Sequence, residues 1–92
     1  MKQTEKIFAL MCYNRTKKMW WYPPDFMKES NGAFFVGYEA SARLSELARN
    51  YPDMIESHSE GKYIYRRIRW SNIGNWFNQL PENLQAIEMR YR

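Results

Sequence analysis

The most closely spaced basic residues lie between residues 60 and 70, where four of them accompany one acidic residue. They are Lys62, Arg66, Arg67 and Arg69, and His58 precedes them. Ammonium and guanidinium groups bind phosphate oxygens through charge-assisted hydrogen bonds. The spacing therefore predicts a cationic surface that binds a polyanion. The alternative is a strand edge whose charge prevents pairing with other chains.

A second group of candidate residues lies in the segment 38–50. An α-helix turns by about 100° per residue, so Ala40, Leu44 and Leu47 would share one side of a helix formed here. The other side would carry Tyr38, Ala42, Ser45 and Arg49, with Ser41 and Glu46 at its edges. These side chains offer hydroxyl, methyl and guanidinium groups to a ligand. They are equally the solvated side of an amphipathic helix. Because the acidic and basic residues of this helix balance, affinity for phosphate must come from elsewhere.

Aromatic side chains make up 17% of the chain. Those of its first part are Trp20, Trp21, Tyr22, Phe26, Phe34 and Phe35. Exposed rings stack on unpaired nucleobases, whereas buried rings form the core of a small domain. Adjacent residues of a strand point in opposite directions. We therefore expect one of Trp20 and Trp21 to be exposed and to contribute to an interface.

No residues are spaced for enzymatic chemistry. His58 is the only histidine, and we interpret it as a surface residue or a phosphate contact and not as a general base. Cys12 lies in an apolar segment and is typical of a small buried hydrophobic residue. The acidic residues are scattered, and the sequence has neither a zinc-binding Cys/His cluster nor a glycine-rich phosphate loop. We expect no enzymatic activity, no metal and no cofactor.

Length and composition predict one small domain spanning residues 1–92. The chain has four Trp, seven Tyr and five Phe, which can fill a core and argue against disorder. No apolar run approaches the roughly 18–20 residues of a membrane span, and the roughly five or six apolar residues after the first six are too few for the apolar core of a signal peptide. We expect a soluble, cytoplasmic domain without a membrane partner. Its net charge of +4 is compatible with a polyanionic ligand.

The elements that must position the candidate residues can be read from periodicity and from turn residues. A helix is predicted from Thr4 to Asn14, with Thr4 as its cap. The aromatic run 19–22 predicts a short strand, which two prolines end. A short helix follows at 24–29, and Ser30-Asn31-Gly32 predicts a turn.

The second half of the chain has the clearer pattern. The helix 38–50 is closed by Pro52, and strands at 54–58 and 63–70 flank a turn at 59–62. Ser71 would begin a helix whose apolar residues are Ile73, Trp76, Phe77 and Leu80. Residues 81–92 predict another helical turn or two, with Leu84, Ile87 and Tyr91 facing inward.

Alternation divides the second strand of this hairpin into two faces. Ile64, Ile68 and Trp70 are expected to pack inward. Arg67 and Arg69 lie on the other face, so we expect them to be the exposed cations. Lys62 lies near the tip, from which it can reach a phosphate group.

The order of these elements resembles that of the winged helix-turn-helix family. Residues 38–49 are similar to its recognition helix, in which a small core residue precedes a Leu-x-x-Leu pair. Residues 51–57 resemble the turn into the first wing strand, and residues 60–68 resemble the wing tip and its returning strand. The similarity covers about residues 4–70.

The resemblance implies an α+β winged helix-turn-helix domain with a three-helix core, a two-stranded β-hairpin wing and a C-terminal helix at 71–92. It also implies binding of double-stranded DNA, with helix 38–50 in the major groove and the wing, residues 54–70, on the backbone. The implied contacts are Tyr38, Ser41, Ala42, Ser45, Arg49, His58, Lys62, Arg67 and Arg69. Such a protein would be a small regulator of transcription or replication in a bacterium, phage or mobile element. Regulators of this family often act as homodimers.

Winged-helix domains also serve as protein-interaction modules, such as adaptors or inhibitors of host machinery. DNA binding predicts one continuous positive surface formed by Arg49, Lys62 and Arg67. Protein binding predicts an apolar patch near Trp20 or Trp21, and base stacking predicts exposed parallel rings beside basic residues. The connection between the predicted second and third helices is also longer than the tight turn of the simplest helix-turn-helix.

Overall fold

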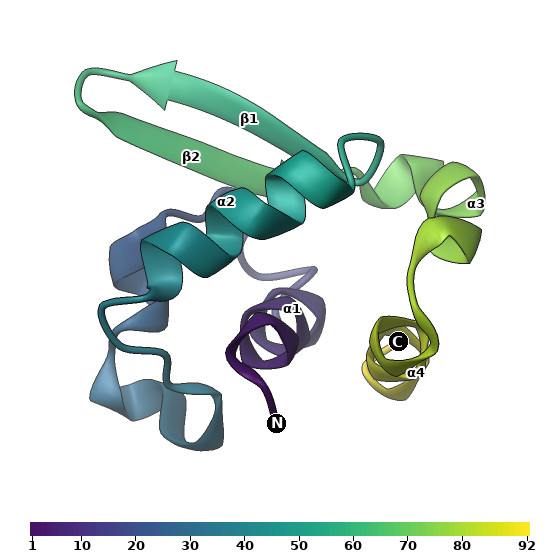
Figure 1. Cartoon of the computed structure of the whole chain (residues 1–92), viewed down its shortest axis with the longest axis horizontal. Coiled ribbons are helices and arrows are strands. Elements are labelled where there is room, and N and C mark those ends of the chain that lie inside the picture. The colour runs from purple at the N-terminus through teal and green to yellow at the C-terminus, as the bar shows by residue number, and fades with distance from the viewer.

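Helix α1 (Gln3–Tyr13) lies at the centre of the computed structural model, which describes residues 1–92 (Figure 1). Every residue from Ile7 to Cys12 is buried, because α2 (Ala40–Asn50) and α4 (Glu82–Arg90) both pack against this helix. The helix begins earlier than predicted. The backbone N–H of Lys2 donates to the Glu5 carboxylate at 2.7 Å, and Thr4 lies within the first turn.

The segment between α1 and α2 is less regular than predicted. The expected strand is reduced to one bridge, in which Trp21 and Arg66 exchange two backbone hydrogen bonds of 2.7 Å. The two prolines that follow lack N–H donors, so pairing cannot continue. Two 3₁₀ helices, η1 (Pro23–Phe26) and η2 (Glu29–Phe34), occupy the place of the predicted short helix and turn.

Helix α2 confirms the predicted apolar face. Ala40, Leu44 and Leu47 are buried, and the helix contacts α1 and η1. It begins two residues later than expected, so Tyr38 lies in the preceding turn with 95% of its surface exposed.

Strands β1 (Ile55–Glu60) and β2 (Tyr63–Ile68) form the predicted antiparallel hairpin. The turn is tighter than predicted, because Glu60 pairs directly with Tyr63. Only two residues remain in the turn, and Gly61 has a φ of 62°. A positive φ at the first turn position is the conformation that glycine supplies in two-residue hairpins.

The two faces of the hairpin have different surroundings. The Arg66 guanidinium reaches Ser45 of α2 at 3.4 Å, so the face of Arg66 and Ile68 is the one turned toward α2. We call it the inner face. Ile64 also belongs to this face but is 46% exposed, which corrects the expectation that it packs into the core. The hairpin tip extends away from the helices (Figure 1).

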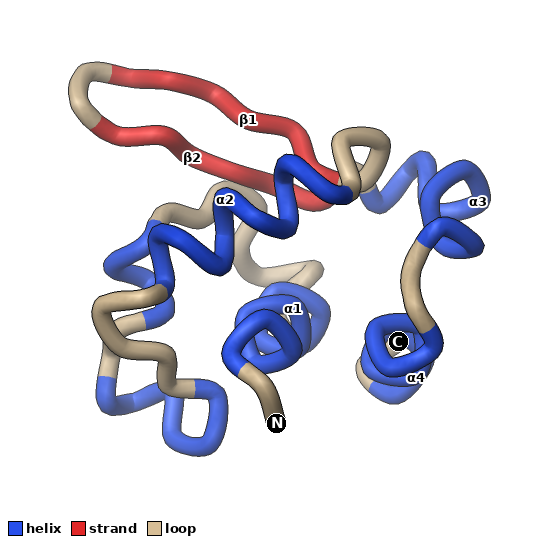
Figure 2. The backbone as a smooth tube through the Cα atoms, in the orientation of Figure 1, coloured by secondary structure: helices blue, strands red, loops and turns tan.

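Three short helical segments connect the hairpin to α4: η3 (Trp70–Asn72), α3 (Ile73–Trp76) and η4 (Phe77–Gln79) (Figure 2). The Trp76 indole N–H donates to the carbonyl oxygen of Arg69 at 2.8 Å, which fixes this connection to the end of the hairpin. Leu84 and Ile87 are buried, as predicted. One cluster of 19 buried apolar side chains includes both, so the C-terminal segment belongs to the common core.

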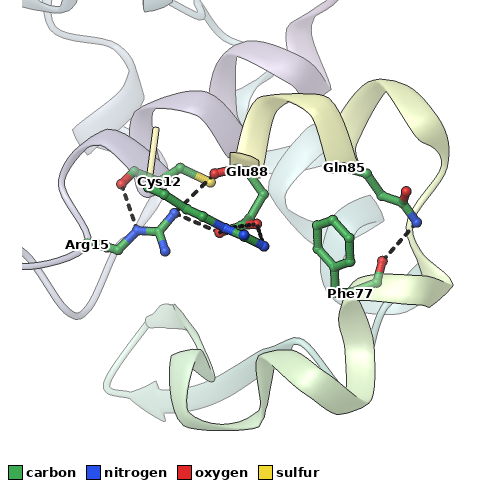
Figure 3. A network of polar contacts seen from close by, with 6 residues as sticks. Cys12, Arg15, Phe77, Gln85 and Glu88 are labelled. Carbon is green, nitrogen blue, oxygen red and sulfur yellow. Dashed lines mark hydrogen bonds and ion pairs between the residues drawn. The ribbon is translucent and has the colours of Figure 1, made fainter. Parts of the chain in front are cut away.

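A buried carboxylate joins α4 to the end of α1 (Figure 3). Glu88 is completely buried and pairs with Arg15 at 3.1 Å and with Arg92 at 2.9 Å. The Arg15 guanidinium also lies 4.0 Å from the ring centroid of Trp70. Arg15 is thereby held between the core and the surface near the base of the hairpin.

Candidate nucleic-acid interface

A groove of about 290 Å³ separates α2 from the hairpin and the start of η1. Its lining combines hydroxyl, cationic and apolar groups: Pro23, Pro24, Ser41, Leu44, Ser45, Lys62, Tyr63, Ile64 and Arg66. Helical periodicity places Ser41 and Ser45 on the same side of α2, one turn apart. The inner face of β2 supplies the opposite wall. The groove thus brings together three predicted contacts, Ser41, Ser45 and Lys62.

Arg66 also lines the groove, although the contacts implied by the winged-helix resemblance do not include it. Its guanidinium donates to Ser57 Oγ at 2.6 Å and to Ser45 Oγ at 3.4 Å. Burial lowers the pKa of Arg66, because the charged group is partly removed from water. The residue was overlooked because it shares the predicted inward face with Ile64 and Ile68. Only the closeness of Ser45, which no sequence pattern shows, identifies it.

The exposed side of α2 continues from this groove. Ser41, Ala42 and Arg49 are exposed, and no ion pair engages Arg49. Arg43, by contrast, pairs with Glu46 at 2.9 Å along the same helix. The exposed side of α2 therefore offers one unpaired cation and several small side chains to a ligand.

The hairpin tip adds a second unpaired cation. Lys62 is exposed in the two-residue turn, and its ammonium nitrogen lies 5.5 Å from the ring centroid of Tyr63. No carboxylate lies within ion-pair distance of it. The tip can therefore approach a phosphate group without first breaking an ion pair.

His58, Arg67 and Arg69 do not join this groove. Arg67 pairs in register with Glu56, and its side chain points away from the face that carries Arg66. Its guanidinium contacts the Glu56 carboxylate at 2.8 Å, and Arg69 contacts the same oxygen at 3.5 Å. We call this opposite side the outer face. The structure therefore separates Arg67 from Lys62 and Arg49, which the DNA hypothesis placed on one surface.

The structure also bears on the thiol of Cys12, on metal binding and on membrane insertion. Cys12 is buried, as predicted, and burial raises the pKa of its thiol to about 12. No three His, Cys, Asp or Glu side chains gather as a potential metal site. No helix is both long and apolar enough to cross a lipid bilayer.

Comparisons with protein-family models, with curated proteins and with solved structures found no match to this chain. Function is therefore inferred from the groove and the surfaces beside it.

Proposed function

We propose that this chain binds double-stranded DNA, with the exposed side of α2 in the major groove and the hairpin tip on the phosphate backbone. The observation that carries this proposal is the groove in which Ser41 and Ser45 of α2 lie beside Lys62 and Arg66 of the hairpin. The major groove of DNA admits an α-helix or a two-stranded ribbon, and here both are adjacent. Serine hydroxyls can contact base edges, and the cations can contact phosphates.

The element order supports a winged-helix version of this proposal. Helix α1 precedes the bridge at Trp21, α2 precedes the hairpin, and the bridge joins Trp21 to β2. The bridge thus stands where the winged-helix pattern has its first strand. The 3₁₀ helices η1 and η2 occupy the place of the second helix and α2 that of the third, while α4 follows the hairpin as the additional C-terminal helix.

The charges set the expected strength of binding. Arg49 and Lys62 are the unpaired cations on this side, and Arg66 is already hydrogen-bonded to two serines. Each phosphate contact contributes about −0.9 to the slope of log affinity against log salt concentration. Two or three contacts give weak binding, so a regulator of transcription or replication would need a second copy on the DNA. The number of protein chains bound per DNA duplex tests this homodimer, for which two are expected.

The test is a fluorescence-anisotropy titration of a random DNA duplex at about 50 and 200 mM salt. Ser45→Glu introduces a negative charge into the groove and should reduce affinity by about tenfold or more through repulsion of phosphate. Ser30→Glu, at an exposed position in η2, makes the same charge change outside the groove and should have little effect. Equal affinities for the two variants would contradict the proposed interface.

The competing function is a protein-interaction module. It is favoured by the aromatic side chains of the outer face, among them Trp20 and Tyr65. A folded chain that binds no duplex even at about 50 mM salt would support this alternative.

A further inference from the structure

The outer face of the hairpin carries a row of aromatic rings. His58 and Tyr65 are cross-strand partners, so both project from this face. Trp21 is buried, and its neighbours Trp20 and Tyr22 point the other way, toward the outer face. The row consists of Trp20, Tyr22, His58, Tyr63 and Tyr65.

The rings of this row leave a hollow between them. Tyr22 and Tyr65 are stacked, with centroids 5.1 Å apart and planes at 24°. Trp20 and His58 form a second pair, with centroids 5.9 Å apart. The hollow, of about 390 Å³, is lined by Trp20, His58, Tyr65 and Glu60. It offers aromatic walls for a planar group and one carboxylate that accepts hydrogen bonds.

A second hollow, of about 270 Å³, has three arginines in its lining, Arg15, Arg67 and Arg69. Its one carboxylate, Glu56, is shared by Arg67 and Arg69. Glu88 pairs with Arg15 from within the core and shares its charge with Arg92. At least one positive charge therefore remains uncompensated in this hollow, which suits an anion such as a phosphate group.

Arg67 connects the two hollows. Its guanidinium carbon lies 4.8 Å from the ring centroid of Trp20, which lines the aromatic hollow, while Arg67 itself lines the arginine hollow. A ligand that fills both must combine a planar ring with a negative charge nearby. A nucleotide has this combination, because its base is joined through the sugar to a phosphate.

We propose that the outer face binds single-stranded nucleic acid, with a base in the aromatic hollow and a phosphate in the arginine hollow. The strand must be single, because a base can enter between aromatic rings only when it is unpaired and unstacked. Glu60 accepts a hydrogen bond from an exocyclic amino group, which cytosine and adenine have and thymine lacks. A proline-rich peptide would fill the aromatic hollow but would leave the arginine charge unmatched.

The experiment measures anisotropy of labelled 12-nucleotide strands with the full chain at about 50 mM salt. Oligo(dC) and oligo(dA) should bind more tightly than oligo(dT), and oligo(rC) distinguishes RNA from DNA as the natural source of the strand. Trp20→Ala should weaken binding about tenfold, because one base loses its stacking partner. Tyr13→Ala removes an exposed ring outside this face and is the matched control.

Two further variants test the hydrogen bond and the phosphate contact separately. Glu60→Ala should abolish the preference for oligo(dC) over oligo(dT), because the acceptor is lost. Arg69→Ala should reduce the salt slope for single strands by about 0.7, and its half-exposed side chain lies outside the core. Circular dichroism checks that each variant is folded.

The proposal is overturned if no strand binds, if Trp20→Ala and Tyr13→Ala bind equally, or if a proline-rich peptide binds this face and the strands do not. It stands apart from the proposed binding of duplex DNA, because the groove and the two hollows of the outer face have no lining residue in common. Ser45→Glu should leave single-strand affinity unchanged, so failure at one surface is distinguishable from failure at the other.

Discussion

The two faces of one hairpin present different chemistry. The inner face lies against α2 and forms a groove with serine hydroxyls, in which Arg66 is the central cation. The outer face carries aromatic rings and the arginines that follow them. Arg66 and Arg67 are neighbours in the sequence but belong to different surfaces, because successive strand residues point in opposite directions. The total charge of the hairpin is therefore divided between two surfaces and gives the charge of neither one.

The faces also differ in how firmly their side chains are held. Arg67 contacts Glu56, the Trp20 ring and the Met19 sulfur, the last at 3.2 Å. Lys62 lies near the Tyr63 ring, and neither Lys62 nor Arg49 has an ion-pair partner. Substitution of Arg67 should therefore change stability as well as binding, whereas substitution of Arg49 or Lys62 should change binding alone.

The largest expected change in stability comes from the buried ion pair between Glu88 and Arg15, a residue that lines the arginine hollow of the outer face. Glu88→Gln removes the charge that holds Arg15 in the arginine hollow and should lower the free energy of unfolding by about 2–3 kcal/mol. Urea denaturation followed by tryptophan fluorescence measures it. Glu82→Gln, at an exposed position of the same helix, is the control. Equal stability of the two variants would show that Glu88 does not anchor α4 to α1.

A smaller change in stability is expected when one arginine is removed from each surface, Arg67 from the outer face and Arg49 from the exposed side of α2. Arg67→Ala should lower stability by about 1 kcal/mol, because an ion pair and a cation–π contact are lost, and should leave duplex binding unchanged. Arg49→Ala should change stability by less than about 0.5 kcal/mol and should weaken duplex binding. Thermal unfolding and anisotropy on the same samples give both quantities. The reverse pattern would contradict the separation of the faces.

The smallest expected effect is the pH dependence of stability caused by Cys12. This residue is buried in the core and belongs to neither face of the hairpin, so it serves as a reference. The raised pKa of Cys12, about 12, means that the folded chain retains the thiol proton more tightly than the unfolded chain does. The associated stability is present below the unfolded pKa of about 9 and is lost as pH rises toward 12. Between pH 7 and 9.5 the loss should be less than about 1 kcal/mol.

Cys12→Ala provides the comparison for this reference. The variant should lack the part of the alkaline loss that the thiol causes, and the native thiol should react with a thiol reagent only after denaturation. Rapid reaction in the native state would show that α1 is not buried as described.

Periodicity was sufficient to predict much of the fold. The spacing of Leu44 and Leu47 identified α2, and alternation with a glycine turn identified the hairpin. Leu84 and Ile87 predicted the inward side of α4. Periodicity failed in the segment between α1 and α2, where no helix is long enough to show a repeat. The 3₁₀ helices there depend on Pro23, Pro24 and the backbone of Gly32, which has a φ of 58°.

The candidate surface was predicted less well. Alternation correctly separated Arg67 and Arg69 from Ile68, but it cannot show which element covers either face. Because α2 packs against the inner face, the outer face, which carries Arg67, points away from α2. The prediction that Arg67 lies on one surface with Arg49 was therefore wrong, and Arg66 was overlooked.

The proposal of duplex binding is tested most directly by the salt dependence of duplex affinity in two matched double variants. Arg49→Ala with Lys62→Ala removes two cations beside the groove, and Arg67→Ala with Arg69→Ala removes two from the outer face. The first pair should reduce the slope of log affinity against log salt by about 2, and the second should leave it unchanged. A slope that falls only with the outer pair would contradict the account and place the DNA on the opposite side of the hairpin.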